Sequence, residues 1–203
     1  MSASSKRQYF DQLAPRWDST QGPDAQARAG QILDRLGELP ASGWVLDAGC
    51  GTGVLVSVLR ERLSPACLIL EVDFAEQMLR LNACAHAGPR VFHLCADVER
   101  LPLAPGSLAL VICYGLYPHL ERPAAALREM LRALRRGGML AIAHSMSSEE
   151  LNAFHRAIGG PVSADRLPPA GELALLLRQM GAEEVRAEEE PGLYLVRGSK
   201  AGS

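Results

Sequence analysis

The sequence has few aromatic residues, no long apolar run and no excess of basic charge. Aromatic side chains make up only 5% of the 203 residues, so aliphatic side chains have to fill most of the core. No run of about 18 apolar residues exists and the N-terminal segment lacks the apolar centre of a signal peptide, so we expect no membrane span. The formal charge of -2 is unlike the basic footprint of nucleic-acid-binding proteins, and we expect no nucleic-acid partner.

The cysteines do not have the spacing of a metal or redox site. None of the five stands in a CxxC pair, which argues against zinc or thioredoxin-like chemistry, and we expect no bound metal. Three of the cysteines stand in apolar runs, which indicates buried thiols, so a reducing, cytoplasmic location is expected. The length fits a single domain over residues 1–203, and no feature indicates a homodimer, although the sequence is compatible with one.

Short apolar runs alternate with helical patterns through most of the chain. This order predicts an α/β fold with a mostly parallel sheet and helices on both faces, because strands buried on both sides read as continuous apolar runs. Strands are expected over residues 44–48, 67–72, 91–95, 108–114 and 139–143, and helices over 54–63, 75–87 and 123–135.

The two ends of the chain differ from this regular middle. Residues 1–43 lack strand character and predict a helical lid, with helices over 6–17 and 24–39, in front of a ligand-binding core over 44–145. Residues 146–198 predict two more helices, over 149–158 and 171–180, and two final strands over 183–189 and 193–196. The small and polar tail 198–203 is expected to be frayed.

A glycine-rich loop follows the first expected strand. Residues 47–53 read Asp-Ala-Gly-Cys-Gly-Thr-Gly and lead directly into a helix, whose start offers free N–H groups. The G-x-G-x-G spacing differs from the G-x-G-x-x-G of dinucleotide-binding loops, so a pyrophosphate is not the favoured ligand. A carboxylate on an amino-acid tail suits the same N–H groups. The alternative is a tight strand-to-helix turn with no ligand.

Two carboxylates mark the ends of the next two strands. Asp73 ends the second strand, where it can accept hydrogen bonds from ribose hydroxyls, and Asp97 follows the third, where it can accept one from an adenine amine. Ligands of open parallel sheets bind at the carboxyl ends of the strands. The loop and the two carboxylates together predict a nucleoside pocket without a phosphate-binding cation.

Five blocks of the sequence resemble the class I S-adenosylmethionine-dependent methyltransferases, and within them the small-molecule branch that includes ubiquinone and menaquinone methyltransferases. Besides the glycine loop at 45–53, they are Tyr-Phe-Asp-Gln-Leu-Ala with Trp-Asp at 9–18, Asp-Phe-Ala-Glu-Gln-Met-Leu at 73–79, Ala-Asp-Val-Glu-Arg-Leu-Pro at 96–102, and the segment 129–138 that ends in Gly-Gly. The resemblance implies a Rossmann-like, seven-stranded sheet with an antiparallel last strand, and S-adenosylmethionine as the cofactor.

The resemblance also implies roles for individual residues. Gly49 and Gly51 would face the methionine part, Asp73 the ribose and Asp97 the adenine, while Asp47 would orient the loop and the methionine amino group. The expected cofactor-binding set is Asp47, Gly49, Cys50, Gly51, Asp73, Phe74, Met78, Asp97 and Val98. We expect Cys50 to be a small residue of the turn and not a nucleophile.

The chain departs from the family pattern in a few places. Leu-Ala at 108–109 stands where Phe-Asp is usual, Arg-Arg at 135–136 where Lys-Pro is usual, and Glu71 where glycine is common. None of these changes removes an expected cofactor contact. The missing carboxylate at Ala109 keeps a non-catalytic binding module open as an alternative.

The sequence gives fewer indications of where the methyl acceptor binds. The segment after the fourth strand borders the transferable methyl group in this fold, and Tyr114 and His119, with His144 at the end of the fifth strand, are the candidate catalytic residues. His155 is expected at the surface. The loop over 159–169 either closes over the acceptor or links two helices.

The sequence therefore predicts methyl transfer from S-adenosylmethionine to a small-molecule acceptor. Methyl transfer from a sulfonium needs alignment and exclusion of water more than it needs a dedicated catalytic group. A non-catalytic S-adenosylmethionine-binding sensor or partner subunit is the first alternative. A dinucleotide oxidoreductase is a weaker one, because the glycine spacing opposes it.

Overall fold

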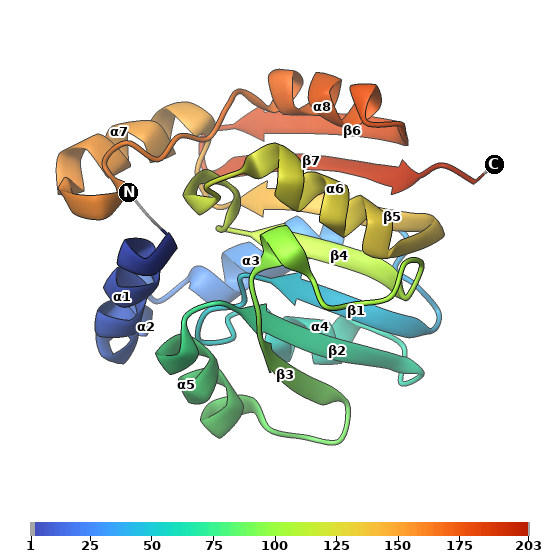
Figure 1. The fold of residues 1–203 in the computed structure, drawn as a ribbon, viewed down its shortest axis with the longest axis horizontal. Coiled ribbons are helices and arrows are strands. Elements are labelled where there is room, and N and C mark those ends of the chain that lie inside the picture. The colour runs from blue at the N-terminus through green and yellow to red at the C-terminus, as the bar shows by residue number, and fades with distance from the viewer. Residues whose placement is uncertain (1–2, 203) are drawn as a thin grey trace.

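A seven-stranded sheet forms the centre of the computed structural model, which describes residues 3–202. The strand order is β3-β2-β1-β4-β5-β7-β6 (Figure 1). The strands are β1 (Gly43–Ala48), β2 (Cys67–Asp73), β3 (Val91–Cys95), β4 (Leu108–Tyr114), β5 (Leu134–His144), β6 (Ala182–Glu190) and β7 (Leu193–Lys200).

The strand directions give the sheet one functional edge. Strands β1 to β5 pair in parallel, whereas β7 runs antiparallel to both β5 and β6. The chain leaves β1 toward β2 on one side and enters β4 on the other, so β1 and β4 flank the topological switch point, where ligands of open sheets bind. The predicted α/β, Rossmann-like fold with its antiparallel strand is confirmed.

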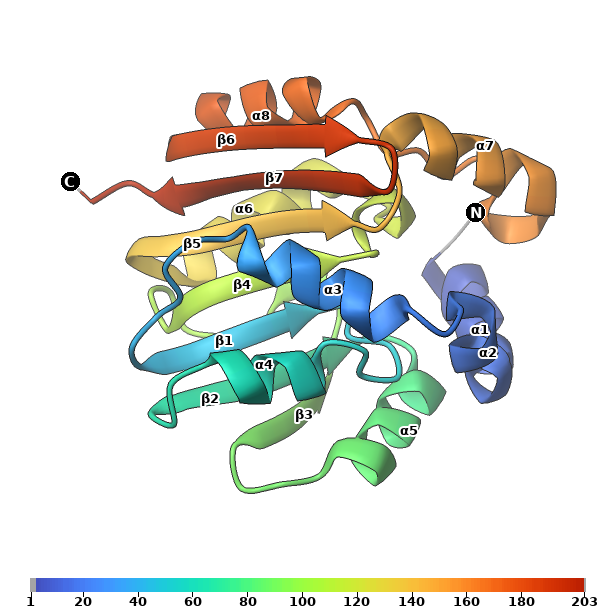
Figure 2. The ribbon, with the colours of Figure 1, turned by 180° about the vertical axis from the view of Figure 1, so that it is seen from behind.

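Helices cover both faces of the sheet. The helices α3 (Ala25–Asp34) and α4 (Val56–Arg62) bury aliphatic residues against one face, seen in front in Figure 2. The helices α6 (Pro123–Ala133) and α8 (Ala170–Gln179) bury a second apolar cluster against the other. Their apolar residues recur at helical spacing, as Ala126, Leu127 and Met130 do in α6, and so form one buried stripe.

The remaining helices lie at the carboxyl ends of the parallel strands. Here α1 (Ala3–Leu13), the 3₁₀ turn η1 (Ala14–Arg16), α2 (Trp17–Gln21) and α7 (Ser148–Ile158) stand beside the arrowheads of the sheet (Figure 1). The helix α5 (Glu76–His86) packs against α1, and Phe10 and Met78 share a small apolar cluster. The N-terminal helices therefore cover the edge at which a ligand is expected.

Several predicted boundaries are wrong. The helix expected over 123–135 ends at Ala133, and β5 already begins at Leu134, so the paired glycines lie inside the strand. Residues 198–200 of the tail predicted to fray are paired instead, because β7 continues to Lys200, whose ammonium donates to the carbonyls of Arg132 and Leu134; residues 201–202 follow the strand and residue 203 lies outside the described residues. The helix expected over 24–39 stops at Asp34.

No helix within residues 3–202 has the length and apolar character needed to cross a bilayer.

Candidate functional site

The glycine loop is held open by backbone contacts to the neighbouring strand. The N–H groups of Gly49 and Cys50 both donate to the carbonyl of Val72, at 2.8 and 3.0 Å. Gly49 has a φ of +72°, and a Cβ built on it would lie 2.8 Å from the side chain of Leu116. This close approach requires glycine, and it keeps the start of the loop next to the segment that follows β4.

Asp73 clamps the loop from the end of β2. One of its carboxylate oxygens accepts from the N–H of Gly51 at 2.9 Å, and the other accepts from the N–H of Ala75 at 2.7 Å. Burial raises the pKa of Asp73, while these two backbone hydrogen bonds act to lower it. Asp73 therefore fixes the shape of the glycine loop and also lines the adjacent cavity.

A cavity of 260 Å³ lies between the glycine loop and the segment after β4. Five of the nine predicted cofactor-binding residues line it, from three different strand ends. Asp97 caps the 3₁₀ turn η2 (Val98–Arg100), because one of its carboxylate oxygens accepts from the N–H of Glu99 at 2.9 Å. The predicted residues that line the cavity are Gly49, Asp73, Phe74, Asp97 and Val98.

Carboxylates gather behind the loop. Asp47 is buried, and one of its oxygens has no hydrogen-bond partner within the described residues. Burial first, and then the charges of Glu71 and Asp73, raise the pKa of Asp47 well above its usual range. Burial also raises the pKa of Glu71 to about 7, against a hydrogen bond from Asn82. The ammonium or sulfonium of S-adenosylmethionine would be stabilised near these carboxyls, but neither Asp47 nor Glu71 lines the cavity itself.

The other predicted cofactor residues lie outside the wall of this cavity. Cys50 is buried in the turn, and burial raises the pKa of its thiol well above the usual range, so the thiolate needed for nucleophilic attack is disfavoured. Met78 packs against Phe10 of the N-terminal helix. The indole nitrogen of Trp17 lies 3.5 Å from a Cβ built on Gly51, so the N-terminal segment covers the loop.

A second cavity, of 340 Å³, opens beside the first. The two share His119, which lies in the 3₁₀ turn η3 (Tyr117–His119) directly after β4. The lining of the second cavity is largely aromatic and aliphatic. Most of it comes from α1, α2, α7 and the ends of β4 and β5. We call it the aromatic cavity, lined by Tyr9, Phe10, Leu13, Trp17, Thr20, Gln21, Arg28, Tyr114, Gly115, His119, His144, Ser145, Met146, Leu151, Phe154, His155, Ile158 and Val162.

All three candidate catalytic residues line the aromatic cavity, but their environments differ. The rings of Tyr114 and His144 stack with centroids 6.5 Å apart. Burial raises the pKa of Tyr114. Burial, with the nearby His119 and His155, lowers the pKa of His144 to about 3, and its Nδ1 is buried without a partner in the described chain. His144 is therefore held neutral and is a poor proton acceptor.

The low pKa of His144 predicts a loss of stability in acid. In the unfolded chain His144 has the ordinary histidine pKa of about 6.5 and takes up a proton near that pH. In the folded protein His144 stays unprotonated until the pH falls to about 3. Stability should fall by roughly 1 kcal/mol per pH unit below about pH 6. His144→Phe removes this titration, so urea unfolding at several pH values should show its stability gaining on the wild type as pH falls. A difference between the two proteins that stays constant with pH would contradict the assignment.

His155 is buried, and the expectation of a surface position is wrong. Only 4% of it is exposed, whereas its neighbour Phe154 is 47% exposed. Both residues line the aromatic cavity, but successive helical residues point about 100° apart, so Phe154 is largely exposed whereas His155 is buried. The Nδ1 of His155 is 3.1 Å from the carbonyl oxygen of Asp165, in the loop that the sequence left unassigned.

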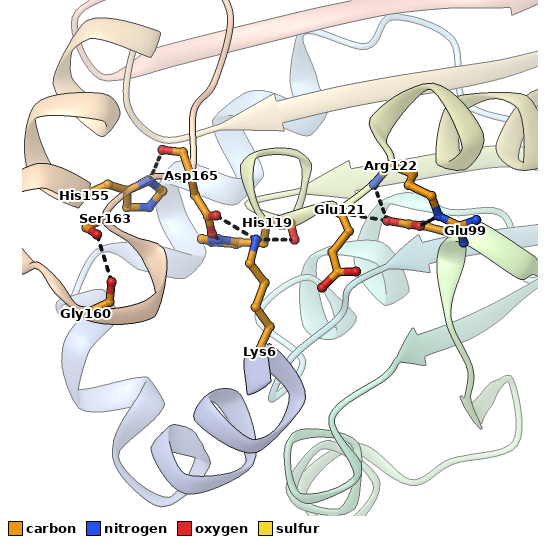
Figure 3. Close-up of polar contacts among 9 residues, drawn as sticks. All are labelled: Lys6, Glu99, His119, Glu121, Arg122, His155, Gly160, Ser163 and Asp165. Carbon is orange, nitrogen blue, oxygen red and sulfur yellow. Dashed lines mark hydrogen bonds and ion pairs between the residues drawn. The ribbon is translucent and has the colours of Figure 1, made fainter. Parts of the chain in front are cut away.

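A buried ion pair lies beside His119 and was not predicted from the sequence. The ammonium of Lys6, on α1, lies 2.6 Å from one carboxylate oxygen of Asp165 and donates to the carbonyl of His119 at 3.0 Å. The other oxygen of Asp165 lies 2.7 Å from Nδ1 of His119 (Figure 3). Lys6 and Asp165 are 159 positions apart and belong to no local pattern, so no signal in the sequence could have paired them.

Known proteins share this sequence pattern and fold. A methyltransferase-domain family model matches residues 46–142. A malonyl-[acyl-carrier protein] O-methyltransferase of Laribacter hongkongensis is 34% identical over 165 residues, covering 76% of this chain and 54% of the relative. A ubiquinone/menaquinone biosynthesis C-methyltransferase of Syntrophotalea carbinolica is 30% identical over 216 residues, covering 92% and 89%.

A solved structure shows the same fold. The phosphoethanolamine N-methyltransferase 2 of Haemonchus contortus, in complex with S-adenosylmethionine, superposes with a TM-score of 0.77 at 14% identity, over 96% of this chain and 58% of that one. The chain belongs to the class I S-adenosylmethionine-dependent methyltransferases, and the predicted family and cofactor are confirmed. It spans about half the length of the first curated relatives it matches.

Proposed function

We propose that this protein transfers the methyl group of S-adenosylmethionine to a small molecule held in the aromatic cavity. The observation that carries the proposal is that two cavities meet at His119, one lined by the carboxylates of Asp73 and Asp97 and the other with aromatic walls. A methyl donor in one and an acceptor in the other would face each other at the end of β4. In-line transfer needs this kind of fixed alignment.

The cofactor orientation follows from the positions of the acidic groups. Asp97 would accept from the adenine amine, Asp73 from the ribose hydroxyls, and Asp47 with the glycine loop would take the methionine end. The helices α1 and α2 would act as a lid, because they supply part of the aromatic cavity wall and cover the glycine loop. Exclusion of water by such a lid supports transfer to the acceptor.

Asp97→Asn tests the adenine contact with little structural damage. The asparagine keeps an oxygen for the N–H of Glu99, but its amide group places a donor where the carboxylate offers an acceptor. We expect about tenfold weaker binding of S-adenosylhomocysteine by calorimetry, the equivalent of one lost hydrogen bond of about 1.4 kcal/mol. The melting temperature should stay near that of the wild type. Equal affinity in the two proteins would remove adenine from this end of the cavity.

Activity is tested by methyl transfer itself. The protein is incubated with S-adenosylmethionine that carries a tritiated methyl group and with fractionated small-molecule extracts. We expect label to enter an apolar, aromatic fraction, and Asp73→Ala to abolish the transfer. The non-catalytic module is the competing outcome. It predicts calorimetric binding of S-adenosylmethionine with no labelled product in any fraction, and that result would overturn the proposal.

A further inference from the structure

His119 has the hydrogen-bonding arrangement of an oriented base. Its Nδ1 lies 2.7 Å from a carboxylate oxygen of Asp165. A carboxylate only accepts, so in the neutral imidazole Nδ1 carries the proton and Nε2 keeps a free electron pair. Burial acts to raise the pKa of Asp165, but hydrogen bonds from His119 and Lys6 outweigh it, and the pKa is lowered. Asp165 is therefore charged and fixes both the tautomer and the direction of the ring.

The N-terminal helix completes this arrangement. The ammonium of Lys6 holds the second oxygen of Asp165 at 2.6 Å and also holds the backbone carbonyl of His119 at 3.0 Å. Phe10, one helical turn further along α1, packs edge-on against the His119 ring with centroids 5.2 Å apart. The side chains of Lys6 and Asp165 are almost fully buried, so their geometry is fixed by packing.

His119 lies where the two cavities meet. Within the described residues, Nε2 has no hydrogen-bond partner, and His119 is a wall of both cavities. The other histidines of the aromatic cavity are less suited to take a proton. His144 is held neutral by its low pKa, and burial lowers the pKa of His155.

The aromatic cavity also restricts the kind of acceptor. Among its lining residues in the described chain there is one cationic side chain, Arg28, and no acidic one. A cationic amine would have no carboxylate to pair with in this cavity, whereas an aromatic ring could pack against Phe10, Trp17 and Tyr114. A carboxylate acceptor is already ionised and has no proton to give, so its methylation would not need a base such as the His119–Asp165 pair.

We propose that His119, positioned by Asp165 and Lys6, takes the proton from an aromatic hydroxyl acceptor as that oxygen is methylated. The acceptor oxygen loses its proton to Nε2 and forms the new O–CH₃ bond. The sulfur keeps the electron pair of the broken S–CH₃ bond and becomes a neutral thioether. The positive charge passes from sulfonium to imidazolium, where the carboxylate of Asp165 stabilises it. This inference rests on the proposed function and adds to it an acceptor class and two positioning residues.

An affinity label tests the base without any methyl transfer. We would treat the protein with 2-(bromoacetyl)naphthalene, whose ring suits the aromatic cavity and whose CH₂ group alkylates a free imidazole nitrogen with loss of bromide. Mass spectrometry should find the label on His119, and Asp165→Asn should slow labelling at least about tenfold, because it disturbs the tautomer. Nitrogen NMR should show Nδ1 protonated in the wild type and a mixture of tautomers in Asp165→Asn.

Glu150→Gln is the control for loosened packing. Glu150 accepts from the N–H groups of Ser147 and Gly192 and holds the start of α7, away from His119. This variant should be labelled at the wild-type rate, and Asp165→Glu should recover part of that rate. Label on His155, or equal rates in wild type and Asp165→Asn, would overturn the role of the pair even if methyl transfer is intact.

A pair of probe acceptors tests the substrate class. With tritiated S-adenosylmethionine, 2-naphthol should be methylated and 2-naphthoate should not. His119→Gln should lower kcat on 2-naphthol by about 100-fold or more, the usual contribution of a general base, while the Kd of S-adenosylhomocysteine changes little. Transfer to 2-naphthoate, transfer to neither probe, or full activity of His119→Gln would overturn the inference. Label entering another acceptor in extracts would still leave the proposed function standing.

Discussion

Asp73→Asn should weaken binding of S-adenosylhomocysteine by about 100-fold, equivalent to about 2.8 kcal/mol. Each carboxylate oxygen of Asp73 accepts a backbone N–H, one from Gly51 and one from Ala75. Asparagine has only one acceptor oxygen, so its NH₂ group must face one of these N–H groups, and the loop loses its fixed shape. The variant also lacks the charged carboxylate whose oxygens would accept hydrogen bonds from the ribose hydroxyls. Isothermal titration calorimetry measures both proteins.

Glu189→Gln is the matched control for this change. Glu189 also accepts one backbone N–H on each oxygen, from Ser148 and Ala170, both at 2.7 Å, but it lies outside both cavities. It should lose a similar amount of stability, read as a lower melting temperature, and keep the wild-type cofactor affinity. If Asp73→Asn binds as tightly as the wild type, the ribose is not held at the end of β2.

Gly49→Ala should strongly weaken cofactor binding. The added Cβ would lie 2.8 Å from both Cβ and Cδ1 of Leu116, and both residues are walls of the 260 Å³ cavity. The φ of +72° adds about 1 kcal/mol of backbone strain for any residue other than glycine. Relief of the contact requires the glycine loop and the segment after β4 to move apart, which changes the shape of the cavity. We expect at least about 100-fold weaker binding, the effect of about 2.8 kcal/mol.

Gly106→Ala separates strain from contact. Gly106 has a φ of +74°, nearly that of Gly49, but a Cβ there would meet nothing within 4 Å. Both variants should lose similar stability from backbone strain, and only Gly49→Ala should lose affinity. Equal affinities for S-adenosylhomocysteine in the two variants would show that Gly49 is not a wall of the cofactor site.

The half of the site that could be predicted from the sequence is the half built from strand ends. Asp73 ends one short, mostly apolar segment and Asp97 closely follows another, and parallel strands bring their carboxyl ends to one edge. The glycines stand between a strand and a helix, where a turn and a close approach are required. Local order along the chain therefore determines these positions.

The other half depends on contacts between distant segments. Asp165 meets His119 across 46 positions and Lys6 across 159, and no periodic pattern connects them. His155 was misplaced because its apolar neighbour suggested an inward-facing Phe154. Hydrogen bonds hold α7 to Glu189 of β6 and to Leu167 and Asp165 of the following loop, and such tertiary contacts override the local signal.

A crystal structure of the protein with S-adenosylhomocysteine and 2-naphthol tests the central claim most directly. We expect the nucleoside in the 260 Å³ cavity, with its adenine amine at Asp97 and its ribose hydroxyls at Asp73. The naphthol ring should lie in the aromatic cavity, with its hydroxyl within hydrogen-bond distance of Nε2 of His119. A nucleoside in the aromatic cavity, or a naphthol bound away from His119, would contradict the account.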